Sequence, residues 1–229
     1  MSERKPFPID PEVMARIRPM LHRDISRVVA LHKAMGTSVW GRLGTDFLVT
    51  LYRGMLAHPD FIGFVYEEPP RVRGMIAGSS NARRLFRDLL RDHARHLVLP
   101  AAKGLLADPR LLPPLLTTPL YFRLSRPGDD VEAESMFCSF EPDLRGKRVS
   151  GHINKVLFDE LLARGQRRVK ITTESDNEGA VRQLTSWGFE EVGRFRFYGK
   201  EMIVYVLDLE TCERVEAVSR HPGPDPRFT

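Results

Sequence analysis

A cluster of basic residues occupies a short turn between a predicted strand, Met136–Phe140, and a predicted helix, Ser150–Arg164. The turn consists of Arg145, Gly146, Lys147, Arg148, Val149, Ser150 and Gly151. The N-terminus of a helix presents unpaired N–H groups and a partial positive charge, so a phosphate binds there readily. Glycine lets the backbone approach a ligand closely. The spacing therefore predicts an anion site at the carboxyl end of a strand, where open sheets bind ligands. An ordinary turn with solvated basic residues is the alternative.

The elements that position this turn come in a defined order. A second predicted strand, Arg168–Glu174, follows the helix, and then Asp176 and Asn177 cap another short helix that ends near Trp187. This ordered set resembles the acyl-CoA-binding half of the GNAT superfamily of N-acetyltransferases. The first three residues of the turn match the common Arg-Gly-Lys opening of the family's Arg/Gln-x-x-Gly-x-Gly/Ala motif. Arg148 and Ser150 replace the two later glycines of that motif.

The resemblance implies how acetyl-CoA, the expected co-substrate, is bound. The strand backbone at Cys138, Ser139 and Phe140 would separate from the next strand and pair with the pantetheine arm. The basic turn would hold the diphosphate. Asn177 and Ala180 match the family's next segment, whose Asn hydrogen-bonds the arm. No metal is expected.

Acetyl transfer to an amine needs a polarised thioester, a neutral amine and a proton or dipole for the leaving thiolate. Glu132 and Glu134 lie near the start of the strand, and period two places them on one face with Met136. The family often has a Glu close to this point, so we predict Glu134 as the base. A solvated strand-edge Glu is one alternative, and His93 or His96 acting as the base is the other.

The general acid departs from the family pattern. The family's usual Tyr aligns with Leu184, and Tyr198 on the following strand is the nearest substitute. Thr185 and Ser186 are weaker candidates. Cys138 is expected to be a small buried residue, since it lies in the middle of a strand.

Composition sets the outer bounds. The chain has 229 residues, of which 42% are hydrophobic and 28% charged, as is typical of a globular protein. No apolar run approaches the ~18 residues of a membrane span, and the N-terminus has no secretion-signal pattern. The two cysteines, Cys138 and Cys212, do not indicate a disulfide framework, so we expect a reducing, cytoplasmic location.

We predict an α/β (α+β) fold, in which a mixed, mostly antiparallel central sheet has helices on both faces, GNAT-like, with a helical insertion between strands 3 and 4. Residues 1–14 would form an N-terminal extension, 15–209 a single domain, and 210–229 a polar, poorly ordered tail. Apart from the elements above, periodicity predicts strands at 15–21, 61–66, 72–78, 189–198 and 203–209, and helices from 22 and at 45–56.

The predicted insertion spans residues 82–120. Its helix candidates are Arg83–Leu97 and, after Pro100, Ala101–Leu106. The segment contains seven Lys or Arg and three Asp or Glu, a net charge of +4 out of +5 for the chain. Three interpretations stay open: a lid over the acceptor pocket, a packing or dimerisation element, and a membrane-facing amphipathic helix.

The sequence thus predicts an acetyl-CoA-dependent N-acetyltransferase acting on a primary amine of a small acceptor, for which an anion is one option. We expect neither nucleic acid nor a membrane as partner, because the basic segment lacks interleaved aromatic residues and no span is present. A homodimer is compatible with the pattern. A non-catalytic CoA-binding sensor and a protein-modifying acetyltransferase are the alternatives.

Overall fold

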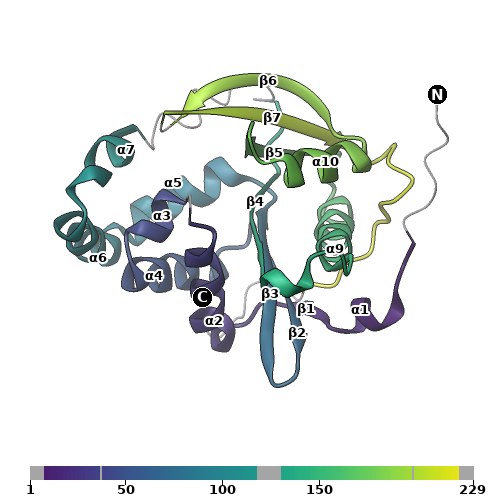
Figure 1. The fold of residues 1–229 in the computed structure, drawn as a ribbon, viewed down its shortest axis with the longest axis horizontal. Helices are drawn as coiled ribbons and strands as arrows, with labels where there is room; N and C mark the ends of the chain where they lie inside the picture. The colour runs from purple at the N-terminus through teal and green to yellow at the C-terminus, as the bar shows by residue number, and fades with distance from the viewer. Residues whose placement is uncertain (1–7, 37, 118–129, 198, 222–229) are drawn as a thin grey trace.

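The computed structural model describes residues 8–36, 38–117, 130–197 and 199–221. Its centre is a seven-stranded sheet in the order β1-β2-β3-β4-β5-β7-β6 (Figure 1). Strands β4 and β5 are parallel, and all other neighbours are antiparallel. The predicted mixed, mostly antiparallel sheet is therefore confirmed. The strands are β1 (Ile17–Pro19), β2 (Phe61–Glu68), β3 (Arg71–Ser79), β4 (Glu134–Phe140), β5 (Arg168–Glu174), β6 (Glu190–Phe197) and β7 (Lys200–Asp208).

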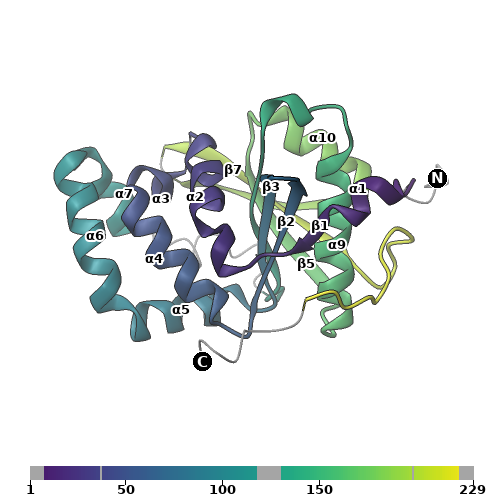
Figure 2. The ribbon, with the colours of Figure 1, turned by 90° about the horizontal axis from the view of Figure 1, so that it is seen from below.

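Helices cover both faces of the sheet, as Figures 1 and 2 show. One face carries α1 (Pro11–Ala15), α9 (Val149–Ala163) and α10 (Glu178–Trp187). On the other side, α2 (Ile25–Ala34), α4 (Thr45–Leu56) and α5 (Ala82–Asp92) pack against the sheet, and α3 (Val39–Arg42), α6 (Ala94–Ala107) and α7 (Leu112–Thr117) lie farther out. The short 3₁₀ helices are η1 (His22–Asp24), η2 (Pro109–Leu111) and η4 (Pro142–Leu144).

Two hydrophobic cores result, one on each face of the sheet. Strand β2 shows why, because its residues are apolar at consecutive positions and alternate between the faces. Ile62 and Phe64 pack in the core beneath α9. Phe61 and Val65 pack in the core beneath α2 and α4. The sequence of β2 is a continuous apolar run because the sheet is buried on both faces.

The helices between β3 and β4 differ in one respect from the prediction. The break was expected at Pro100, but α5 ends at Asp92 and α6 runs through Pro100 to Ala107. His93 makes the break, with φ −114° and ψ 6°. Proline removes one intrahelical hydrogen bond, and the packing of Leu97 and Leu105 against the core outweighs that loss here. Residues 118–120 of the predicted insertion lie outside the described residues.

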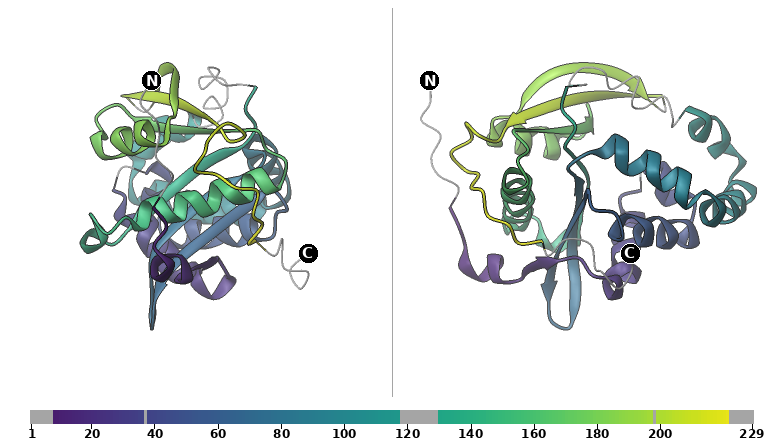
Figure 3. Two further views of the ribbon diagram at one scale, coloured as in Figure 1. Left: turned by 90° about the vertical axis from the view of Figure 1, so that its right-hand side faces the viewer. Right: turned by 180° about the vertical axis from the view of Figure 1, so that it is seen from behind.

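The C-terminal segment also departs from the prediction. A poorly ordered tail was expected from Glu210 onward, but residues 210–221 run along α9 (Figure 3). The buried Glu160 carboxylate accepts hydrogen bonds from the N–H groups of Arg220 (2.7 Å) and His221 (3.0 Å). Asp159 accepts one from the N–H of Glu216 (2.9 Å). Buried polar groups on α9 therefore hold this segment in place.

Candidate functional site

The turn between β4 and α9 has the backbone geometry of an anion site. Gly146 (φ +80°) and Arg148 (φ +57°) both adopt the left-handed conformation, which favours a concave arrangement of N–H groups. Arg148 is the N-cap residue of α9, and its side chain makes no capping hydrogen bond. The first N–H groups of α9, from Val149 onward, are therefore open to an anion.

The charges around this turn add to that geometry. The three cationic side chains of the turn are exposed. Within the described part of the chain, neither Arg145 nor Arg148 forms an ion pair with a carboxylate. The neighbouring acids Glu141 and Asp143 are bound by Arg73 instead, with 2.6 Å between Glu141 Oε2 and Arg73 Nε. Electrostatically, the turn therefore faces solvent as a cationic surface. The structure places all seven predicted turn residues together. Arg145, Gly146, Lys147 and Arg148 are exposed, Ser150 is half-buried, and Val149 and Gly151 are buried.

Strands β4 and β5 separate beside this turn. Glu134 pairs with Lys170 at the start of both strands, and the N–H of Lys170 donates to the carbonyl of Ala133 (2.9 Å). No further ladder pair joins the two strands among the described residues. One edge of β4 therefore offers N–H and C=O groups along a gap that leads to the turn, and this separation is the one that the family resemblance implies.

The side chains of β4 are largely used in packing. The Ser139 hydroxyl donates to the carbonyl of Leu31 (2.8 Å), which fastens α2 to the strand. The ring of Phe140 lies over Gly74, where an added Cβ would come within 2.3 Å of Phe140 Cδ1. A bulge at Met136 interrupts the pairing of β3 with β4, because Gly78 faces Ser135 and Ala77 faces Phe137. Ligand contacts from these positions would come from the backbone.

Asn177 and Ala180 meet at the start of α10. The Oδ1 atom of Asn177 accepts a hydrogen bond from the N–H of Ala180 (3.2 Å) and caps the helix. The Nδ2 group of Asn177 has no partner within the described residues, and the residue is exposed beyond the end of β5. A donor amide therefore stands at the edge of the gap between β4 and β5.

Glu134 lies at the closed end of that gap, on the face covered by α2 and α4. Its side chain is 6% exposed, and Oε2 lies 3.8 Å from the Nζ of Lys170, which is 3% exposed. Glu132 is exposed, and its carbonyl accepts the N–H of Ala82 (3.1 Å). Of the two glutamates Glu132 and Glu134, only Glu134 therefore lies next to the gap. Lys170 was not predicted, although a single lysine between the apolar residues Val169 and Ile171 was a usable signal.

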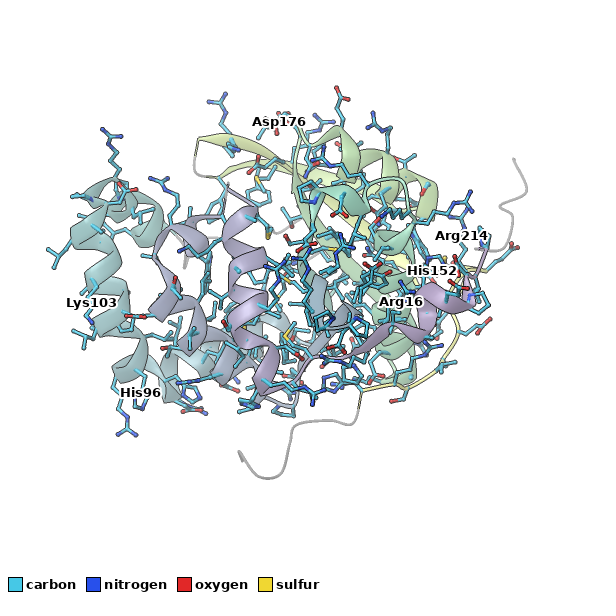
Figure 4. All side chains as sticks on the ribbon, turned by 60° about the horizontal axis from the view of Figure 1, so that its bottom comes forward. Arg16, His96, Lys103, His152, Asp176 and Arg214 are labelled. Carbon is cyan, nitrogen blue, oxygen red and sulfur yellow. The ribbon has the colours of Figure 1, made fainter. Side chains whose placement is uncertain are left out.

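The other proposed bases lie elsewhere. His93 and His96 stand at the α5–α6 junction, where they line a cavity with α2 and α4 and with no residue of β4 or β5. Figure 4 shows His96 at the opposite end of the molecule from His152 of α9. The structure therefore does not bring these two histidines to Glu134.

The candidates for a general acid have different surroundings. Leu184 is buried in the core beneath α9. The hydroxyls of Thr185 and Ser186 donate to the carbonyls of Val181 (2.9 Å) and Gln183 (2.7 Å) within α10. These two hydroxyl protons are therefore committed to the helix. Tyr198 lies outside the described residues.

Cys138 is poorly suited to covalent catalysis. Burial raises the pKa of its thiol to about 12, only partly opposed by the nearby Asn154 amide at 4.0 Å. The thiol is therefore protonated at neutral pH, and the thiolate is the nucleophilic form. The side chain of Cys138 is only partly buried, so the expectation of a small buried residue is met in part.

A buried imidazole beneath β4 was missed by the sequence analysis. His32 of α2 is fully buried, with Nδ1 2.8 Å from the Tyr52 hydroxyl and Nε2 2.8 Å from the Ser38 hydroxyl. Burial lowers the pKa of His32 to about 4, so its ring is neutral. The ring also lies 4.7 Å from that of Phe137 on β4. His32 thus ties α2, α3 and α4 together under the site. In the sequence, His32 falls in register with the apolar residues of α2, so the sequence alone indicates an ordinary core position.

Comparison with known proteins gives a consistent fold assignment. No family model matches the chain. A mycothiol acetyltransferase from Brachybacterium faecium is 33% identical over 76 residues, which is 33% of this chain and 23% of that protein. The match therefore spans about a quarter of that curated relative's length.

Solved structures resemble the chain over most of its length. The ribosomal-protein-S18-alanine N-acetyltransferase from Escherichia coli has a TM-score of 0.54 at 12% identity, over 84% of this chain and 92% of that one. The protein yncA from Salmonella typhimurium, solved with its cofactor acetyl-CoA, has a TM-score of 0.52 at 17% identity, over 92% and 97%. A protein from Desulfovibrio desulfuricans described as of the GNAT family has a TM-score of 0.51 at 11% identity, over 84% and 98%. The resemblance to GNAT acetyltransferases is thus confirmed at the level of the fold.

Proposed function

We propose that this chain, which has the fold of the GNAT acetyltransferases, is an acetyl-CoA-dependent N-acetyltransferase that acetylates a primary amine of a small acceptor. One observation carries the proposal most directly. The uncapped start of α9 stands at the end of the gap between β4 and β5, and beside it Arg145 and Arg148 form no ion pair with any described residue. Acetyl-CoA combines a diphosphate with an extended amide arm, which suits a cationic turn next to an unpaired strand edge.

Each part of the site has a proposed role in binding. The N–H groups of Val149 to Gly151 and the cations of the turn hold the diphosphate. The β4 backbone from Cys138 to Phe140 pairs with the pantetheine amides, and the Nδ2 group of Asn177 donates to the same arm. The thioester then lies toward Glu134, because the arm runs along β4 from the turn at its end.

The chemistry proposed for the chain's own residues is direct transfer. Glu134 accepts a proton from the acceptor's ammonium group or, through a water molecule, from the attacking amine. The amine nitrogen forms a bond to the acyl carbon, and the carbon–sulfur bond breaks. Tyr198 is the proposed donor of the proton that the leaving thiolate takes up. Lys170 holds the Glu134 carboxylate in place through their ion pair.

Two alternatives have specific support. A CoA-binding sensor without turnover is favoured by the burial of Leu184, which occupies the position of the family's usual acid. A protein-modifying acetyltransferase is favoured by the likeness to the E. coli enzyme, whose name gives a ribosomal protein as its acceptor.

Thiol release from acetyl-CoA, measured against amino sugars, polyamines, amino acids and peptides, separates the three functions. The proposal predicts release with at least one small amine and none without an acceptor. Release with peptides alone would select the protein-modifying enzyme. Tight acetyl-CoA binding without release for any amine would select the sensor.

A further inference from the structure

A second cationic site lies away from the proposed acetyl-CoA turn. A cavity of about 850 Å³ opens between the start of α2, one face of α4 and the α5–α6 junction. Five of its lining side chains are basic, and none of those among the described residues is acidic. We call this cavity the basic cleft. Its basic residues are His22, Arg23, Arg53, His93 and His96.

A close approach of two helices forms one wall of the basic cleft. Gly54 of α4 faces the end of α5, and a Cβ added there would lie 2.6 Å from Leu89 Cδ2 and 3.3 Å from His93 Cδ2. Glycine at this position leaves room for the side chains of Leu89 and His93 against α4. His93 then leaves the helical conformation and turns the chain into α6, which sets its ring 6.5 Å from that of His96. The two imidazoles therefore share this wall.

The lining of the basic cleft also includes two guanidinium groups, those of Arg23 and Arg53. In the described chain, Arg23 and Arg53 form no ion pair, whereas the nearby Arg18 is bound to Asp24 (2.7 Å) and Arg42 is bound to Asp108 (2.5 Å). The acids of α5 are also occupied, since Asp88 is bound by Arg87 and Arg91 and Asp92 is bound by Arg91. The guanidinium groups of Arg23 and Arg53 thus keep their positive charge in the basic cleft, whereas most arginines near them are paired with carboxylates.

We propose that the basic cleft binds a phosphate-bearing anion with at least two negative charges. Guanidinium groups bind phosphate through paired, charge-assisted hydrogen bonds. The hydroxyls of Ser26 and Thr45 line the same cavity and supply neutral donors, whereas the Thr50 hydroxyl donates to the carbonyl of Asp46 (2.9 Å). The volume is in the usual range for a small-molecule site, about 300–1,000 Å³.

This site is independent of the proposed acetyl-CoA site. None of the residues that line the basic cleft belongs to β4, β5 or α9. Figure 2 shows the α5–α6 junction toward the lower edge of the molecule and the segment between β4 and α9 at the upper edge. A ligand in one site therefore leaves the other open.

Calorimetric titration with inorganic pyrophosphate tests the proposal on the full chain. Because the acetyl-CoA turn would also take pyrophosphate, three variants are compared with the wild type. They are Arg23→Glu with Arg53→Glu in the basic cleft, Arg145→Glu with Arg148→Glu in the turn, and Arg110→Glu with Arg196→Glu as a charge-matched control. The control residues are exposed and line neither site.

The wild type and the control should bind two pyrophosphates, and each site variant should bind one. The affinity of the basic cleft should fall at least about tenfold in its own variant, because two charge-assisted contacts are lost. A cleft variant that titrates like the wild type would overturn the proposal. A turn variant that titrates like the wild type would instead contradict the assignment of the turn as the diphosphate site. The proposal for the basic cleft would be unaffected.

A second experiment with lipid vesicles distinguishes a lipid headgroup from a soluble phosphate ester. Sedimentation with vesicles that contain about one fifth phosphatidylglycerol, beside neutral phosphatidylcholine vesicles, tests a lipid headgroup. Binding to the anionic vesicles that the cleft variant loses identifies a headgroup, and pyrophosphate binding alone identifies a soluble phosphate ester. Failure of the cleft to bind either probe would refute the proposal.

Discussion

At the scale of single residues, the candidate site contains a buried ion pair. Glu134 and Lys170 lie side by side where β4 and β5 separate, and both are almost fully buried. Removing one partner of such a pair leaves the other charge in the interior without compensation, which is strongly destabilising. A loss of activity on mutating Glu134 alone would therefore mix a chemical effect with a structural one.

A double substitution separates the two effects. Glu134→Gln should cost about 3 kcal/mol of unfolding free energy, because Lys170 keeps its charge without a partner. Adding Lys170→Met should restore most of that stability, since an apolar pair can replace a buried ion pair. Acetyl transfer should stay at least about 100-fold below wild type in both variants, because the base is missing. Urea unfolding and kcat measure the two quantities.

Recovery of kcat together with stability in the double variant would contradict the assignment of Glu134 as the base. In that case the carboxylate would serve only to neutralise Lys170.

At the scale of elements, His32 joins three helices and makes their packing sensitive to pH. Its pKa is lowered to about 4 by burial, against 6.5 for the ordinary group. The unfolded chain therefore takes up a proton near pH 6.5 that the folded chain resists. The resulting stability is fully present above pH 6.5 and is lost as the pH falls through 4, by up to about 3 kcal/mol. His221, whose pKa burial also lowers to about 4, adds a similar contribution.

Urea unfolding at pH 7.5, 5.5 and 4.5 tests this account. The wild type should lose stability over this range, and His32→Gln should lose less, because the imidazole of His32 no longer titrates. Equal losses in the two proteins would show that His32 does not resist protonation in the fold.

Helix α9 depends in turn on the C-terminal segment that covers it. Glu160 accepts hydrogen bonds from the backbone of Arg220 and His221 and from the Ser219 hydroxyl (3.1 Å). Glu160→Ala should therefore destabilise the protein by about 2–4 kcal/mol and expose residues 210–221 to proteolysis. Glu178→Ala, which removes an exposed carboxylate from α10, is the control and should change little. Unchanged protease resistance in Glu160→Ala would mean that other contacts hold the segment.

The elements also show how far the sequence could lead. Helix α4 and strand β5 have the predicted bounds, because apolar spacing and turn residues agree there. The break before α6 was assigned to Pro100, whereas α5 ends at Asp92, where His93 lies close to Gly54 of α4 in space. The segment after Glu210 looked disordered by composition. Its partners are carboxylates on α9 about sixty residues earlier, which no local pattern indicates.

The same limit applies to the candidate site. The turn at Arg145 was visible because a strand, glycine and basic residues lie within one short stretch. Lys170 and His32 were not, because their roles arise from β4 being close to β5 and to α2 in space. The sequence therefore indicated the part of the candidate site that is contiguous in the chain, and the residues brought in from other elements became visible only in the fold.

At the scale of the whole molecule, the sheet separates two regions. The core beneath α9 carries the proposed acetyl-CoA turn, and the core beneath α2 and α4 carries the basic cleft. Helices α5 and α6 belong to the second core, because Leu85, Leu89 and Leu97 are buried in it. Deleting this segment would thus uncover α4, and point variants are the better probes of it. No helix among the described residues is long and apolar enough to span a membrane.

The central claim is that the turn from Arg145 to Gly151 holds the diphosphate of acetyl-CoA. Thermal unfolding with acetyl-CoA at about 100 times its Kd tests it most directly, since that ligand excess should add about 2.7 kcal/mol to the wild type. The account predicts that this stabilisation disappears in Arg145→Glu with Arg148→Glu and persists in Arg110→Glu with Arg196→Glu. Equal stabilisation of the turn variant and the wild type would contradict it.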